Sequence, residues 1–399
     1  FRCLVGRSRV RSEVWDEAGA RRDAADALEL ADSLGDPADR AVALLRLGTA
    51  AARAGDSERA EVELSESIRI FEETGDLQGR AEALREKGLA ALLRGDSRGA
   101  EDPIAAALDA FRSVGDRRGE AWCLQNLAWI ALSDGRPVAA AEFVAASEEA
   151  FREVGDRGGL SWAQGLAAFC RLGEGDLDAA GEIAGRILRE SERRGDRFGV
   201  GMMLTALAHV ELWQGRARAA AASAERAVTA FASSTELAGT VGLEQAMAIA
   251  GRAEIMAGNT GKGRHLLAEA VRSGPGGAPS VYASGVALVT DVQLGRPERV
   301  VALDPDLWSV AAGSGRRGDQ DAALALALAQ SGRVAEAVRR ADAAVGSDPD
   351  HGYVVACAAL VAAAAGDHER ARERAIRVLG LVRATYLDRV WARIVLALV

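Results

Sequence analysis

The stretch AGNTGKGRHLL, residues 257–267, contains a glycine–lysine–glycine run that suggests phosphate chemistry. A phosphate-binding loop of the form G-x-x-x-x-G-K-[ST] needs a glycine five residues before Gly261, where the chain has Met256. It also needs Ser or Thr after the lysine to hold magnesium, and that position is Gly263. A buried strand should come first, but residues 243–258 are rich in Ala and Glu with helical spacing. The stretch therefore predicts no nucleotide hydrolysis.

Histidine and cysteine, which most often carry metal or nucleophilic chemistry, are few and scattered. No H-E-x-x-H or G-x-S-x-G motif occurs in the sequence. His351 and Cys357 are six residues apart, which is not the spacing of one helix face, so we expect no zinc site there. No pair of carboxylates is singled out by its spacing. We predict no catalytic residue, no metal site and no cofactor in this chain.

Composition excludes several classes of partner. The 399 residues carry a formal net charge of −9, which gives no overall basic character for nucleic acid. The longest apolar run, VVACAALVAAAA at 354–365, is too short to cross a bilayer. Four widely spaced cysteines are typical of buried thiols in a reducing cytosol: Cys3, Cys123, Cys170 and Cys357. We expect a cytoplasmic protein that contacts neither nucleic acid nor membrane through this segment.

The two ends of the sequence suggest part of a longer polypeptide. The chain starts at Phe1 and ends on the apolar run IVLALV. Apolar helices at the two ends would also allow the chain to form a homo-oligomer, and the sequence does not decide this.

The elements that would position any site follow a sequence repeat, and regularly spaced glycines mark this repeat. Glycine recurs at a constant step, at positions 35, 55, 75, 95, 115, 135, 155, 175, 195 and 215. Asp follows it at 36, 56, 76, 96, 116, 156, 176 and 196. Glycine can end a helix in the left-handed conformation and Asp can cap the next helix. Because the stretches between them have apolar residues at helical spacing, each step predicts one helix of about 17 residues and a tight turn.

The full period is two such steps, because alternate helices differ. One class carries Ala at 20, 60, 100, 140, 180 and 220, and Phe at 71, 111, 151 and 231, with Ser191 interrupting the Phe series. The other carries a small residue at Gly48, Gly88, Ala128, Ala168 and Ala208. Small residues in register allow helices to approach closely, and each Phe should pack under the start of the next helix pair. A helix hairpin of this size must stack on its neighbours to bury its apolar face.

These positions resemble the tetratricopeptide repeat (TPR). Leu47-Gly48, Gly55 and Ala60 match the family's Leu-Gly pair, turn glycine and early alanine of the second helix. The 40-residue period is similar to the long variant in large bacterial ATP-dependent regulators of the maltose-activator and LuxR type, and in actinobacterial ATPase–cyclase proteins. The resemblance implies an all-α, TPR-like α-solenoid, a right-handed superhelix of antiparallel helix pairs.

The spacing of the turn glycines divides the chain into three parts. Residues 1–231 hold the regular 40-residue repeats, and 232–243 are expected to form an irregular joint. Residues 244–399 hold shorter, degenerate repeats, with turn glycines expected at 258, 295, 332 and 366. Residues 272–280 are a loop by composition, and Pro305 is expected to interrupt a short helix at 301–308.

The resemblance also implies that the first helix of each pair lines a concave wall where a ligand binds. Bulky residues recur there in register with the repeat, as with Trp122 and Trp162. Aromatic and methionine side chains suit the anchors of a peptide or partner helix. The predicted groove consists of Trp122, Gln125, Trp129, Trp162, Phe169, Met202, His209 and Trp213. Packing of the same residues in the core is the alternative.

These observations favour a non-catalytic recognition module. We predict a sensor or scaffold portion of a larger cytosolic bacterial signalling or transcription regulator, binding a protein, peptide or effector in its groove. Two alternatives stay open at this point. One is a peptide-pheromone receptor that acts alone. The other is the recognition arm of an enzyme, an ATPase–cyclase or a CHAT-type protease, whose catalytic part lies elsewhere.

Overall fold

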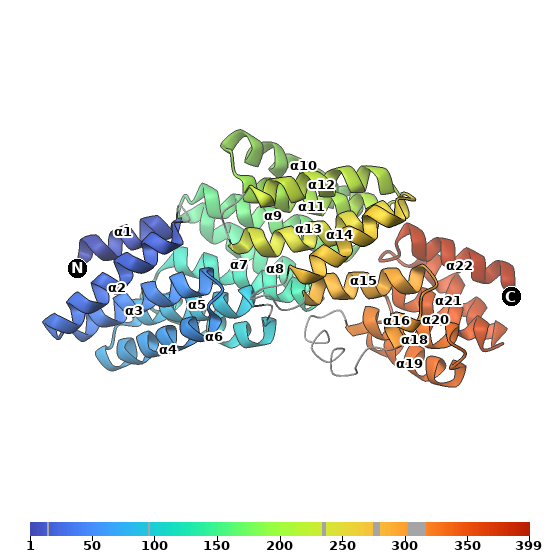
Figure 1. The fold of residues 1–399 in the computed structure, drawn as a ribbon, viewed down its shortest axis with the longest axis horizontal. Coiled ribbons are helices and arrows are strands. Elements are labelled where there is room, and N and C mark those ends of the chain that lie inside the picture. Colours follow the sequence, from blue (N-terminus) through green and yellow to red (C-terminus); the bar gives the residue numbers. More distant parts are fainter. Residues whose placement is uncertain (14–15, 95, 234–236, 274–279, 302–316) are drawn as a thin grey trace. The chain divides into compact units, whose positions relative to one another are not determined.

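The structure is a computed structural model that describes residues 1–13, 16–94, 96–233, 237–273, 280–301 and 317–399 (Figure 1). Within these ranges the chain forms helices and no strand. The helices are α1 (Arg2–Glu13), α2 (Glu17–Leu34), α3 (Pro37–Arg53), α4 (Ser57–Thr74), α5 (Leu77–Leu93), α6 (Ser97–Val114), α7 (Arg117–Ser133), α8 (Pro137–Glu153), α9 (Arg157–Glu174), α10 (Leu177–Arg194), α11 (Arg197–Trp213), α12 (Ala217–Ala232), α13 (Leu237–Met256), α14 (Thr260–Arg272), α15 (Val281–Gln293), α16 (Glu298–Val301), α18 (Arg317–Gln330), α19 (Val334–Ser347), α20 (Gly352–Ala364), α21 (His368–Gly380) and α22 (Tyr386–Leu398). The all-α prediction is confirmed.

The helices end at the predicted glycines. Each described turn glycine has a positive φ, from 67° to 98°: Gly35, Gly55, Gly75, Gly115, Gly135, Gly155, Gly175, Gly195, Gly215, Gly258, Gly295, Gly332 and Gly366. Gly95 lies outside the described residues, as do Pro305 and most of the loop expected at 272–280. At Gly75 the amide of the next residue, Asp76, donates to the Phe71 carbonyl at 3.0 Å and closes the end of α4.

Aspartate caps the following helix, as predicted. The side chain of Asp76 accepts a hydrogen bond from the Gly79 amide at 2.9 Å and thereby satisfies a free donor of the first turn of α5. Equivalent capping bonds recur at Asp36, Asp56, Asp96, Asp116, Asp156, Asp176 and Asp196. Turn and cap together explain why the helices repeat with a constant step.

The phenylalanine series packs under the next helix pair. A methyl group at Gly79 would come within 2.4 Å of Phe71, and one at Gly119 within 2.4 Å of Phe111. The same holds for Gly159, where the gap to Phe151 is 2.2 Å. Each ring therefore lies directly against helix backbone that carries no side chain, and Phe71, Phe111, Phe151 and Phe231 are all buried.

Small residues also bring the two helices of a pair together. A methyl group at Gly48 would lie 2.6 Å from Leu64 Cγ, and one at Gly88 would lie 2.4 Å from Ile104 Cγ1. Pairs α3–α4 and α5–α6 therefore pack at a separation that a larger side chain would not permit. The predicted alanine series, Ala20, Ala60, Ala100, Ala140, Ala180 and Ala220, is fully buried.

The helices group into two compact units. One consists of Phe1–Leu166 with Ala232–Val241, and the other of Ala167–Phe231 with Gly242–Val399. Helix α13 begins at Leu237, inside the stretch 232–243 that we expected to be an irregular joint. The three-part division at 1–231, 232–243 and 244–399 stays a prediction.

Within the second unit, the start of α22 packs on turns that come much earlier in the chain. A methyl group at Gly175 would lie 2.8 Å from the Val382 carbonyl oxygen. One at Gly215 would lie 2.7 Å from Cγ of Tyr386. Helix α22 also contacts α11. The last helices are thus held against the turns after α9 and α11.

Lys262 has a structural role that explains the glycine–lysine run. It lies in the first turn of α14, after the turn glycine Gly258. Its ammonium contacts the carboxylates of Glu225 on α12 and Glu254 on α13, the latter at 2.7 Å. Lys262 therefore joins three helices.

Candidate functional site

Four residues of the predicted groove belong to the first unit. Trp122, Gln125 and Trp129 come from α7, and Trp162 comes from α9. Gln125 is buried and the three tryptophans are half-buried. The Trp122 ring stands edge-on to Phe151 at 5.0 Å, against a core that includes Ala121 and Ala163. Trp122 and Gln125 thus contribute to packing, which was the alternative that the sequence left open.

The other four predicted residues belong to the second unit. Phe169 and Trp213 are half-buried and pack against a core of Leu172, Ala180 and Val210. Met202 is buried, which leaves little of its side chain for a ligand. His209 is half-buried, with its Nε2 at 3.5 Å from the Tyr282 hydroxyl. A ligand groove formed by the eight residues stays a prediction.

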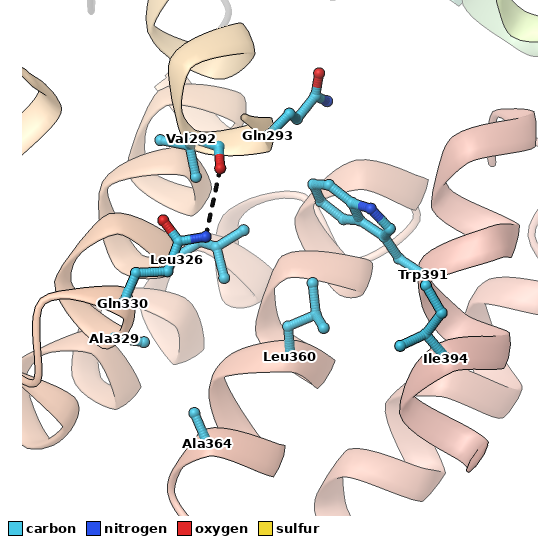
Figure 2. A pocket seen from close by; sticks show the side chains of 9 residues that line it. All are labelled: Val292, Gln293, Leu326, Ala329, Gln330, Leu360, Ala364, Trp391 and Ile394. Carbon is cyan, nitrogen blue, oxygen red and sulfur yellow. Dashed lines mark hydrogen bonds between the residues drawn. The ribbon is translucent and has the colours of Figure 1, made fainter. Parts of the chain in front are cut away.

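A pocket that we did not predict lies in the second unit (Figure 2). It has a volume of about 350 Å³ and is lined from α15, α18, α20 and α22, the first helices of successive pairs. The lining residues are Val292, Gln293, Leu326, Ala329, Gln330, Leu360, Ala364, Trp391 and Ile394. This is the class of helix that we expected to face a ligand, and the volume is in the range of about 300–1,000 Å³ that is usual for ligand pockets.

The walls of this pocket are apolar except for two carboxamides. In Figure 2 the Trp391 indole and the Leu360 side chain extend into the space between α18 and α22. Trp391 is half-buried, and its ring lies 6.0 Å from that of Tyr353. Gln330 Nε2 donates to the Val292 carbonyl at 3.3 Å, which joins α18 to the end of α15. Gln293 Nε2 is buried without a hydrogen-bond partner.

The sequence held only a weak signal for this pocket. After Phe231 the turn glycines stand at 258, 295, 332 and 366, so the constant step of the earlier repeats is lost. We chose Trp122 and Trp162 because they are 40 residues apart, one full repeat. This spacing does not extend to Leu326, Leu360 and Trp391.

The carboxyl of Glu244, which is buried, lies in the same unit at the N-terminus of α15. Glu244 Oε1 accepts a hydrogen bond from the Ser280 hydroxyl at 2.9 Å, and the same hydroxyl caps α15 by accepting from the Ala283 amide. Glu244 Oε2 is buried without a partner. Burial raises the pKa of Glu244 to about 7, opposed in part by the bond from Ser280. Glu244 is therefore partly protonated near neutral pH.

Glu244→Gln is expected to change how stability depends on pH. Because the pKa of Glu244 is raised, the folded protein holds this proton more tightly than the unfolded chain, in which the glutamate has a pKa of 4.5. The proton on Glu244 therefore stabilises the folded state fully below pH 4.5, and this stabilisation is lost as the pH rises through about 7. The free energy of unfolding of the variant, relative to wild type, should therefore grow by on the order of 2–3 kcal/mol from about pH 5 to about pH 8. Urea unfolding at both pH values measures this.

The control for this prediction is Glu58→Gln, because Glu58 is exposed on α4. Its stability difference from wild type should be the same at both pH values. An equally flat difference for Glu244→Gln would show that Glu244 titrates normally.

The described part of the chain contains no metal-binding cluster. No group of three or more His, Cys, Asp or Glu side chains there could hold a metal ion. Burial raises the pKa of Cys123 and of Cys170 to about 12, which keeps both thiols protonated and unreactive. Cys357 is buried too, but Cys3 is exposed, so our expectation of four buried thiols is wrong for Cys3. None of the described helices combines the length and the hydropathy that a bilayer-spanning segment needs.

The fold and this pocket define a class of protein: a TPR-type α-solenoid with a largely apolar pocket between four of its helices. No protein-family model and no curated protein matches the sequence. Several solved structures share the fold, among them a quorum sensor. The apo form of the quorum sensor NprR from B. thuringiensis aligns with a TM-score of 0.57 and 13% identity, over 86% of this chain and 97% of that one.

Two of the similar structures contain a bound partner. A Rap protein complexed with competence and sporulation factor aligns with a TM-score of 0.63 and 12% identity, over 86% of this chain and 96% of that one. NprR in complex with its cognate peptide NprX aligns with a TM-score of 0.58 and 12% identity, over 78% of this chain and 92% of that one. At such identities the similarity establishes the TPR-type repeat fold.

Proposed function

We propose that this chain is a non-catalytic recognition module that binds a peptide segment in the pocket between α15, α18, α20 and α22. The observation that carries the proposal is the pocket itself, which combines an apolar floor with two side-chain amides. Apolar side chains anchor a peptide, and amides can pair with its backbone. NprR, which has the same fold, binds a cognate peptide.

We propose that the module is the sensor or scaffold part of a cytosolic bacterial signalling or transcription regulator. A receptor that acts alone on a signalling peptide is the second candidate, supported by the quorum sensor NprR among the similar structures. The peptide-binding step is common to both, so one experiment tests it.

The test blocks the pocket from an exposed position. Ala364 lines the pocket and is exposed, so Ala364→Trp fills the space with little disturbance of the core. Ala365→Trp is the matched control, because Ala365 is the next residue, is also exposed and does not line the pocket. A library of random peptides displayed on phage is selected against the purified wild-type chain, and enriched peptides are titrated against both variants.

Enriched peptides should bind wild type and Ala365→Trp alike, and Ala364→Trp at least about tenfold more weakly, a loss of about 1.4 kcal/mol. Failure to enrich any peptide over an unrelated helical protein would overturn the proposed function. Equal binding to both variants would move the site away from this pocket.

A further inference from the structure

The wall of the pocket carries no charge. Its nine lining residues are aliphatic, aromatic or amide side chains. A charged group placed against the buried members, Val292 and Leu326, would lose its hydration without gaining a counter-ion, which is costly in an apolar setting. An apolar side chain would instead gain contact with Leu326, Leu360 and Trp391. The chemistry of the wall therefore selects neutral, apolar occupants.

The carboxamide of Gln293 adds a second requirement. Gln293 Nε2 is buried and has no partner, and such a group is costly unless something pairs with it. The carbonyl of a peptide group is an acceptor of the kind that Gln293 Nε2 lacks.

From these two features we infer the chemical class of the occupant, an inference that rests on the proposed function. The pocket takes one uncharged apolar side chain of the leucine or phenylalanine type, and Gln293 Nε2 donates to the carbonyl of the peptide group next to it. Trp391 forms one side of the space that this side chain fills. Gln293 is accordingly a binding residue that discriminates a peptide from a plain hydrocarbon.

The test uses capped single residues as probes, so it needs no knowledge of the natural ligand. The N-acetyl methylamides of leucine, phenylalanine, lysine and glutamate are titrated into the 399-residue chain labelled with 5-fluorotryptophan. The Trp391 signal in the fluorine NMR spectrum is assigned by its loss in Trp391→Phe. The leucine and phenylalanine probes should shift this signal saturably, and the lysine and glutamate probes should bind at least about tenfold more weakly.

Gln293→Leu isolates the role of the amide. It should weaken the leucine probe by about three- to tenfold, the range expected for one hydrogen bond. Gln214→Leu is the matched control, since Gln214 lies at the end of α11 and outside the pocket, and it should leave the titration unchanged. Neutral and charged probes of equal affinity, or no shift of the Trp391 signal, would overturn the inference. An unchanged affinity in Gln293→Leu would overturn the role of the amide.

The two proposals fail separately. Peptides enriched from the library together with an unmoved Trp391 signal would leave the recognition function standing and refute the chemistry assigned to the pocket. Saturable probe binding with no enriched peptide would support that chemistry and refute peptide recognition.

Discussion

Replacement of Phe111 by alanine is expected to lower the free energy of unfolding by about 3–5 kcal/mol. The ring is buried between α6 and α7, and it lies against the backbone at Gly119. No side chain on that part of α7 can move into the space, so a cavity would remain. Because helix pairs in a solenoid contact mainly their neighbours, the loss should be local. Urea unfolding gives the magnitude, and hydrogen exchange should show faster amide exchange around α5–α7.

Val114→Ala is the control, because Val114 lies on the same helix as Phe111 but is exposed. It should change stability by less than about 0.5 kcal/mol. If Phe111→Ala were equally mild, the Phe series would not hold successive helix pairs together.

The second large effect is expected at Gly215, where conformation and space act together. Gly215 has a φ of 79°, and a methyl group there would lie 2.7 Å from the Tyr386 ring. Gly195 has a φ of 69°, but a methyl group there would meet nothing within 4 Å. Gly195→Ala therefore measures backbone strain alone, about 1–2 kcal/mol. Gly215→Ala should cost about 1–3 kcal/mol more, because α22 must shift. Thermal and urea unfolding compare the two.

A double variant tests the cause. Tyr386 is half exposed, so Tyr386→Ala removes the ring without opening a deep cavity. The excess cost of Gly215→Ala over Gly195→Ala should largely disappear in the Tyr386→Ala background, which is a coupling that a double-mutant cycle measures. Equal costs for the two glycines in wild type would mean that α22 does not press on this turn.

The helices and their ends were predictable because their causes are local. A left-handed turn at Gly75 and a cap from Asp76 to Gly79 involve residues within a few positions of one another. The Phe71 and Gly79 contact is also short in sequence and recurs at Phe111 and Phe151, so one repeat could be checked against the next. Local preferences of this kind act before any tertiary contact forms.

The placement of side chains across helix pairs was not predictable in the same way. Trp122 and Trp162 were selected by register, but the sequence left open whether they face a ligand or the core. Trp122 lies against Phe151 of α8, the second helix of its own pair, and Gln125 is buried. Register gives the side of a helix on which a residue lies, whereas exposure depends on how closely the helices around it approach.

The amino-acid pattern alone established the class of fold, the turn glycines, the aspartate caps and the packing of the Phe series. The pocket around Trp391, the Ser280–Glu244 bond and the contact of Tyr386 with Gly215 emerged only from the folded chain. The physical reason is distance along the sequence. Each of these features joins residues from different helix pairs, and their meeting depends on the small rotations between pairs, which no local spacing encodes.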